Sequence, residues 1–267
     1  MGFSRSRLVS IFNRRVIFWT NYEISEKFEW QMVRKNLPKL LNIKLSATIS
    51  RSVLFSPIEI IKLYKIPVMG VLHIGAHKGD EADAYHEIGI KKATFIEPIK
   101  ENYMELIKRL HKYPNYQALQ VAAGDQNLET FMFLASNDLQ SSSLLEPADH
   151  LEQNPEITFN STEKVKMRRV DSLEISNELN YWVIDVQGFE LSVLRGAGTK
   201  LENCDYAFVE LNRANVYHGC VKFQELDEFL ISKGFQRVLT RWWDIWGDGF
   251  YVRTTKLPLE MSLNDKA

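Results

Sequence analysis

The sequence predicts an α/β fold in which an open, mostly parallel β-sheet is covered by helices on both faces. From residue 68 onward, apolar runs of strand length alternate with segments whose apolar residues recur at helical spacing. The apolar runs are nearly continuous, which is typical of parallel strands that are buried on both faces. The last two strand-like runs follow each other without a helix, so the sheet is expected to end in a hairpin.

Five strand–helix units are expected before that hairpin. Apolar runs predict strands at residues 68–74, 93–97, 116–123, 181–186 and 206–211. Helical patterns predict helices at residues 80–88, 98–111, 188–194 and 223–233, with Gly89 and Gly234 at helix ends and Pro98 near a helix start. The alternation stops after the third strand, where residues 130–135 and 165–170 predict two further strands around a polar stretch. Residues 236–240 and 249–253 predict the closing hairpin.

Length and composition limit the class of protein. The chain has 267 residues, of which 45% are hydrophobic and 25% charged, and its formal net charge is −1. This composition excludes a disordered chain and a coiled-coil rod. Because nucleic-acid-binding proteins usually carry a basic excess, no nucleic-acid partner is expected. The cysteines Cys204 and Cys220 do not form a CxxC pair, which favours a reducing, cytoplasmic compartment.

One main domain is expected at residues 67–255, with an N-terminal helical extension at residues 1–66 and a polar tail at residues 256–267. Within the extension, residues 1–35 combine apolar residues at helical spacing with several arginines. A basic amphipathic helix can lie on an anionic membrane surface, so peripheral membrane contact is one interpretation and packing on the domain is the other. No apolar run reaches the roughly 18 residues that span a bilayer.

The first strand ends in a glycine-rich turn. In an open parallel sheet, ligands bind beyond the carboxyl ends of the strands, near the point where the strand order reverses. The turn reads HIGAHKGD over residues 73–80, with His77 and Asp80 where a dinucleotide-binding turn has its second and third glycines. It therefore suits a nucleoside without phosphates, and a purely structural turn is the alternative.

Two further strand ends carry residues suited to a nucleoside. Glu97 closes the second strand about 20 residues after the glycine turn, where a carboxylate can accept both ribose hydroxyls. At the third strand end, small residues up to Ala123 leave room for a flat ring, and Asp125 is placed to accept a hydrogen bond from an exocyclic amine. The alternatives are a surface carboxylate at Glu97 and a simple Gly-Asp turn at Asp125.

Acidic residues mark the fourth and fifth strand ends. Asp185 and Glu210 are expected to face one crevice, because the carboxyl ends of neighbouring parallel strands meet at the same edge. Such a pair could orient a cationic ligand, hold a hydroxyl substrate or bind a hard metal ion such as Mg²⁺. Without a third ligand in the pattern no metal site is assigned, and a helix N-cap is the alternative for Asp185.

Seven motifs occur in a fixed order between residues 68 and 253. They are HIGAHKGDE, FIEPIKENY, AAGD, SSSL, IDVQGFELSVLRGA, VELNRANVYHG and WGDGFYVR. In order and spacing, this series resembles the FkbM-type S-adenosylmethionine-dependent methyltransferases. The resemblance implies a class I methyltransferase fold, which is Rossmann-like, with a seven-stranded sheet whose last strand is antiparallel. It also implies S-adenosylmethionine as cofactor and methyl transfer to a hydroxyl of a sugar, a polysaccharide or another natural product.

Applied to this sequence, the resemblance implies that the strand ends supply the cofactor contacts. The implied contact residues are His73, Gly75, Ala76, His77, Gly79, Glu97, Pro98, Ala123, Asp125 and Asp185. The chain departs from the common family pattern at three positions, having His73 where Asp is common, His77 where Asn is common and Val183 where Lys is common. A strand-end histidine satisfied by the backbone is the alternative for His73.

A hydroxyl is a poor nucleophile at neutral pH, so methyl transfer to oxygen calls for a base or a metal. Asp185 is the first candidate for the base or for a carboxylate that orients the acceptor, and Glu210 is the second. His218 is the third candidate, and the alternative is that it is an exposed loop histidine without a catalytic role. The candidates for shaping the acceptor site are Ser141–Ser143, Trp242, Trp243 and Trp246. Packing in the core or at an interface is the alternative for the tryptophans.

Three other functions stay open from the sequence. The first is a catalytically inactive, methyltransferase-like binding module. The second is a nucleotide-dependent oxidoreductase, which His77 disfavours because its imidazole would obstruct a pyrophosphate. The third is a membrane-associated scaffold that uses residues 1–35.

Overall fold

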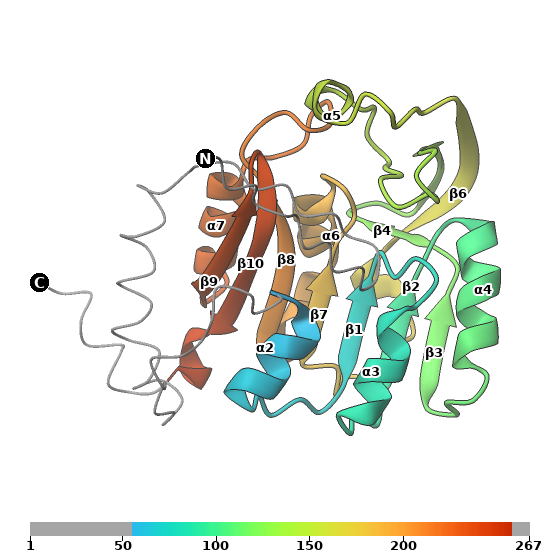
Figure 1. Ribbon diagram of the computed structural model, residues 1–267. Helices are drawn as coiled ribbons and strands as arrows, with labels where there is room; N and C mark the ends of the chain where they lie inside the picture. Colours follow the sequence, from blue (N-terminus) through green and yellow to red (C-terminus); the bar gives the residue numbers. More distant parts are fainter. Residues whose placement is uncertain (1–54, 258–267) are drawn as a thin grey trace, which may run out of the picture.

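A seven-stranded sheet runs through the middle of the computed structural model, which describes residues 55–257 (Figure 1). Its strands are β1 (Val71–Ile74), β2 (Ala93–Ile96), β3 (Tyr116–Leu119), β7 (Tyr181–Ile184), β8 (Tyr206–Asn212), β9 (Phe235–Trp243) and β10 (Trp246–Arg253). They lie in the order β3–β2–β1–β7–β8–β10–β9. β10 is inserted between β8 and β9 and is antiparallel to both. The predicted α/β fold, with its closing hairpin and antiparallel last strand, is confirmed.

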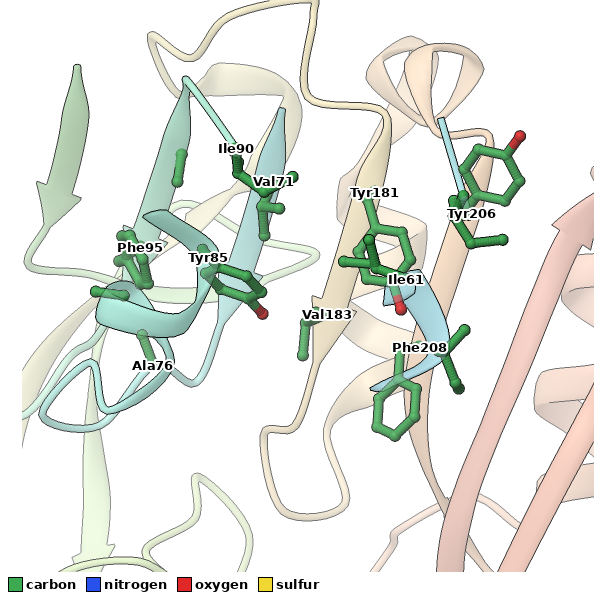
Figure 2. Packing of buried hydrophobic residues seen from close by; sticks show 14 of the residues in the cluster. Ile61, Val71, Ala76, Tyr85, Ile90, Phe95, Tyr181, Val183, Tyr206 and Phe208 are labelled. Atoms are coloured by element: carbon green, nitrogen blue, oxygen red, sulfur yellow. The ribbon is translucent and has the colours of Figure 1, made fainter. Parts of the chain in front are cut away.

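Helices cover both faces of this sheet. They are α2 (Pro57–Tyr64), α3 (Glu81–Glu87), α4 (Lys100–Leu110), α6 (Glu190–Gly196) and α7 (Phe223–Ser232). One core cluster joins α2, α3 and α4 to strand residues such as Val71, Tyr181 and Phe208 (Figure 2). A second cluster joins α6 and α7 to the alternate strand residues, among them Leu72 and Trp182. Successive strand residues thus serve opposite cores, which explains why the strands are almost continuously apolar.

The third predicted strand is wrong in one respect, because the chain breaks it in two. After β3 the backbone turns at residues 120–121, and β4 (Ala122–Gly124) leaves the main sheet. β4 joins β6 (Ser161–Arg169), which also pairs with β5 (Leu128–Leu134), so that the small sheet has the order β4–β6–β5. Instead of a covering helix, the chain between β3 and β7 forms this sheet, the short helix α5 (Asp149–Gln153) and the 3-10 turn Val170–Ser172. Hence four of the five expected strand–helix units occur.

Contact between two backbones holds β4 in this position. A Cβ atom on Gly196, the last residue of α6, would lie 1.7 Å from the Gly124 carbonyl oxygen. The helix therefore packs against β4 at a distance that only glycine allows. The small residues at this strand end serve this packing as well as the cavity described below.

Replacing Gly196 by alanine is expected to lower the free energy of unfolding by about 2 kcal/mol, since the new methyl group must push the helix away from β4. Urea unfolding measures the loss. The matched control is Arg195→Ala, an exposed position in the same helix, where a change within about 0.5 kcal/mol is expected. Equal stability of the two variants would contradict the tight contact.

The N-terminal part of the described chain packs on the sheet. The Ser56 side chain caps α2 by accepting a hydrogen bond from the Glu59 N–H at 3.2 Å, and Pro57 occupies the first helical position. α2 buries Ile60, Ile61 and Tyr64 in the first core cluster. The predicted amphipathic segment at residues 1–35 lies outside the described residues, as does the tail beyond residue 257. Within residues 55–257, no helix is long and apolar enough to cross a bilayer.

Candidate active site

A cavity opens at the carboxyl ends of β1, β2 and β7, where the strand order reverses between β1 and β7. It has about 530 Å³ of empty space, counted with its opening to solvent. The predicted residues in its wall are Gly75, His77, Glu97, Pro98, Ala123 and Asp185. The other side of the cavity is formed by Met132, Leu139, Gln140, Ser142 and Leu144, from β5 and the loop that follows it.

The glycine turn is fastened to both neighbouring strands. The N–H groups of Gly75 and Ala76 each donate to the Ile96 carbonyl at 3.0 Å, and the Asp185 N–H donates to the Ile74 carbonyl at 3.0 Å. Gly75 has φ +82°, and a Cβ atom there would lie 1.7 Å from the Asp185 carbonyl oxygen. Only glycine fits between the ends of β1 and β7, so the turn and Asp185 are positioned by the same contact.

The His77 side chain contacts the loop on the far side of the cavity. Its backbone has φ 50°, and its N–H donates to Glu97 Oε2 at 2.9 Å. Its ring Nε2 lies 2.7 Å from the Asp138 carbonyl oxygen, which can only accept, so this nitrogen carries the proton. The neighbouring Lys78 pairs with the Asp138 carboxylate at 2.6 Å. Both contacts connect the glycine turn to the loop on the far side of the cavity.

Glu97 is almost fully buried, with 4% of its surface exposed. Its second carboxylate oxygen, Oε1, accepts from the Ile99 N–H at 2.9 Å. Burial raises the pKa of Glu97 to about 7, although the N–H groups of Ile99 and His77 and the Asn102 side chain favour the charged form. The carboxyl group therefore changes its charge close to neutral pH.

Asp185 and Glu210 lie at neighbouring strand ends and are bridged by one amide. Gln187 Nε2 donates to Asp185 Oδ1 at 2.7 Å and lies 3.2 Å from both carboxylate oxygens of Glu210. Asp185 and Gln187 line the cavity, whereas Glu210 is buried behind them. The two acids thus lie at one edge of the sheet, as predicted, and Gln187 lies between them.

Gln187 is held in place from several sides. It has a left-handed backbone, φ 58°, and its carbonyl accepts from Ser143 Oγ at 2.7 Å. The Tyr217 hydroxyl lies 2.9 Å from both Gln187 Oε1 and the Ser141 carbonyl oxygen. Ser143 and Tyr217 are both buried. These contacts fix the direction in which the amide meets the two carboxylates.

A third acid, Glu190, completes this group. Its Oε1 accepts from the N–H groups of Val186 and Gly188 at 3.1 and 3.0 Å. Glu190 thus binds the free backbone donors before α6, while Asp185 does not cap that helix, whose N-cap residue is Phe189. Burial and the Asp185 charge raise the pKa of Glu190 to about 7. Burial and the charges of the neighbouring acids Asp185 and Glu190 raise the pKa of Glu210.

Several predicted site residues lie outside the cavity wall. His73 is 4% exposed, and its ring Nδ1 lies 3.2 Å from the Tyr85 hydroxyl within the core between β1 and α3. Ala76 belongs to the same core, and a Cβ atom on Gly79 would lie 2.5 Å from Leu106 Cδ1. The cofactor contacts of His73, Ala76 and Gly79 stay predictions.

Two loop residues are also not brought to the cavity. The Asp125 carbonyl accepts from Arg169 at 3.0 Å, and Val121 and Ala122 line the cavity instead of Asp125. His218 is exposed, and its N–H donates to the Glu146 carbonyl at 2.8 Å. The cofactor role of Asp125 and the catalytic role of His218 stay predictions.

An aromatic cluster lies at the same edge of the sheet, at the tip of the β9–β10 hairpin. Trp243 and Trp246 stack with their ring centroids 5.0 Å apart, and the Arg213 guanidinium lies 3.8 Å from the Trp242 ring centroid. The tryptophans are half-buried. Within residues 55–257, no three His, Cys, Asp or Glu side chains are grouped so as to hold a metal ion.

Sequence reasoning did not single out Asn102 or Gln187 as site residues. Both line the cavity. Gln187 stands inside the most specific motif, between Asp185 and Glu190, and that position is the signal that could have found it. Asn102 lies in the first turn of α4, the helix that follows Glu97, where side chains return toward the strand end.

Comparison with known families gives one match. The family model "Methyltransferase FkbM domain" matches residues 73–237. No protein with curated annotation matches the chain.

Solved structures with a similar fold are distant in sequence. The ribosomal protein L11 methylase of Lactobacillus delbrueckii subsp. bulgaricus is 11% identical, with 74% of this chain and 76% of that chain covered and a TM-score of 0.42. M. capricolum TrmK, solved with S-adenosyl-homocysteine, is 10% identical, with 77% and 70% covered and a TM-score of 0.43. Likeness at this level carries no argument about activity. The family model, however, spans more than half of the sequence, so the chain belongs to the FkbM family of methyltransferases, as the order of its motifs indicated.

Proposed function

We propose that this protein is an S-adenosylmethionine-dependent O-methyltransferase that acts on a hydroxyl of a sugar, a polysaccharide or another natural product. The observation that carries the proposal is that Glu97 and Asp185 line one cavity; we assign Glu97 to the ribose hydroxyls and Asp185 to the acceptor alcohol. Family membership supports methyl transfer, and the chemistry of the cavity supports an oxygen atom as the methyl acceptor.

The chemistry of the cavity wall suits an adenosine-bearing cofactor. Gly75 lets the turn after β1 lie directly against the Asp185 backbone, which holds this part of the cavity wall in place. Apolar side chains such as Ile96, Ile99 and Phe189 offer a surface for a flat ring, and Glu97 offers carboxylate oxygens for hydroxyl groups. When bound, S-adenosylmethionine supplies an activated methyl group, and its sulfur leaves as a neutral thioether that needs no protein acid.

The chain's own task is therefore to position the acceptor oxygen and take its proton. Gln187 occupies Asp185 Oδ1, which leaves Oδ2 for the acceptor hydroxyl. Glu210 stands behind Gln187 and acts through it, so we assign Asp185 the role of base or orienting carboxylate and Glu210 the supporting role. Holding the acceptor in line accounts for a further part of the rate.

The decisive experiment incubates the full chain with methyl-labelled S-adenosylmethionine and a panel of glycans and hydroxyl-bearing natural products. Label transferred to oxygen, identified by mass spectrometry, supports the proposal. Repeating the assay with EDTA tests the Mg²⁺ alternative. Binding of S-adenosylhomocysteine without transfer to any hydroxyl in a broad panel would favour the inactive binding module, and transfer to nitrogen alone would overturn the assignment to oxygen.

The affinity for S-adenosylhomocysteine is expected to fall as the pH is lowered from about 8 to about 6, by up to about tenfold per unit below the pKa of Glu97. The raised pKa of about 7 means that the carboxyl group becomes protonated in this window, and a protonated carboxyl accepts fewer hydrogen bonds. Calorimetry should accordingly detect proton release on binding. The control is Glu97→Gln, which should bind more weakly and with a smaller pH dependence. A wild-type affinity that is constant over the window would contradict this role of Glu97.

A further inference from the structure

The Gln187 side chain uses every hydrogen-bonding atom of its amide inside the site. The atom that lies 2.7 Å from Asp185 Oδ1 is the nitrogen Nε2, because an ionised carboxylate only accepts. The second hydrogen on Nε2 is available to Glu210, whose carboxylate oxygens both lie at 3.2 Å. Oε1 therefore points the other way, to the Tyr217 hydroxyl at 2.9 Å. The direction of the amide depends on this donor at its oxygen as well as on the two acids at its nitrogen.

Tyr217 lies behind the cavity and does not line it, and the residue is only 1% exposed. Its hydroxyl has two acceptors at 2.9 Å, Gln187 Oε1 and the Ser141 carbonyl oxygen. Burial and the charges of the neighbouring acids raise the pKa of Tyr217, so the hydroxyl keeps its proton and donates it. Since Tyr217 is buried outside the cavity wall, it can act on a bound molecule only through another side chain.

Tyr217 also belongs to a pair of chain segments that hydrogen-bond each other. It lies in the loop after β8, and the partner segment lies between β5 and β6. The Ala148 N–H donates to the Val216 carbonyl at 3.0 Å, and the His218 N–H donates to the Glu146 carbonyl at 2.8 Å. The segment between β5 and β6 also forms the far wall of the cavity. Tyr217 therefore connects this wall to the amide that meets the base.

We propose that Tyr217 is a positioning residue for methyl transfer, because its hydroxyl holds Gln187 in the direction in which the amide fixes Asp185. The inference rests on the proposed function, since it concerns the base of the same reaction. With Oδ1 bound by the amide, Oδ2 stays available to the acceptor hydroxyl. Without the Tyr217 hydroxyl, Oε1 loses its donor and the amide can turn away from Asp185. The carboxylate then takes several directions, and fewer of its encounters with the acceptor are in line for proton transfer.

The test is a double-mutant cycle on the full chain, in which methyl transfer to the acceptor found in the panel assay is measured with labelled S-adenosylmethionine. Tyr217→Phe keeps the ring and removes only the hydroxyl, and it is expected to lower kcat about tenfold. Its affinity for S-adenosylhomocysteine should stay close to that of wild type, which also shows that the variant is folded. In the Asp185→Asn background, Tyr217→Phe should cause no further loss, because the group that Tyr217 positions no longer takes a proton. A purely structural role would lower both rates by the same factor.

The matched control is Tyr251→Phe. Tyr251 is fully buried, and its hydroxyl donates to Asp227 Oδ1 at 2.7 Å, outside the cavity wall. This variant should transfer methyl at the wild-type rate. A wild-type rate for Tyr217→Phe, or an equal loss with and without the Asp185 carboxylate, would overturn the assignment while the proposed function stands. If the wild-type chain transfers methyl to no hydroxyl in the panel, the proposed function fails first and the assignment fails with it.

Discussion

Replacing Gly75 by alanine is expected to weaken S-adenosylhomocysteine binding by about 100-fold or more. The new methyl group would lie 1.7 Å from the Asp185 carbonyl oxygen, a backbone atom that no side-chain rotation can move. The turn must then separate from β7, which displaces the rim of the cavity and Asp185 together. Isothermal titration of the variant measures the loss.

The control for this substitution is Gly89→Ala. Gly89 also has a left-handed backbone, with φ +87°, but a Cβ atom there meets nothing within 4 Å. Both variants carry the backbone strain, about 1 kcal/mol, and only Gly75→Ala carries the steric clash. Wild-type affinity is expected for Gly89→Ala. If the two variants lost affinity equally, strain rather than contact with Asp185 would be the cause, and the account of the turn would be wrong.

Replacing Asp185 by asparagine is expected to slow methyl transfer by about 100- to 10,000-fold. The change keeps the shape of the side chain but removes its ability to take a proton. It also lets an amide face Gln187 Nε2, which needs an acceptor at 2.7 Å. The rate is measured by transfer of labelled methyl to the acceptor found in the panel assay.

Cofactor affinity separates this role from a purely structural one. Asp185→Asn should bind S-adenosylhomocysteine within a few-fold of wild type, because the turn contact uses the Asp185 backbone and not its carboxylate. Asp83→Asn, on the surface of α3 and outside the cavity wall, should transfer methyl at the wild-type rate. A wild-type rate for Asp185→Asn would eliminate Asp185 as the base.

The main sheet was predictable because each of its central strands packs side chains into the hydrophobic cores on both faces. β1 and β7 are buried along their whole length, so their apolar runs stand out from the chain around them. The break between β3 and β4 was not predictable in the same way. The single polar residue Gln120 separates Val121 and Ala122 from the apolar residues before them, and a single polar residue does not mark a strand end, whereas the approach of α6 to Gly124 shows that the strand has left the sheet.

The site was predictable where it depends on strand ends and not where it depends on side-chain direction. Gly75, Glu97 and Asp185 each follow a strand directly, so topology alone brings them together. Gln187 reaches Asp185 through a left-handed backbone that sequence spacing does not reveal. His218 lies in a loop with no periodic pattern, and its exposed position follows from contacts with a distant loop at Glu146.

Because β4 leaves the main sheet, one wall of the cavity is built by the strand ends of that sheet and the other by a separate segment of the chain. The far wall of the cavity, including Met132, Leu139 and Ser142, belongs to a segment that starts after β4 and returns through β6. No strand of the seven-stranded sheet passes through this segment. Grafting it from one relative onto another should therefore exchange substrate preference while the scaffold keeps its register, which makes chimeras a direct route to new acceptors.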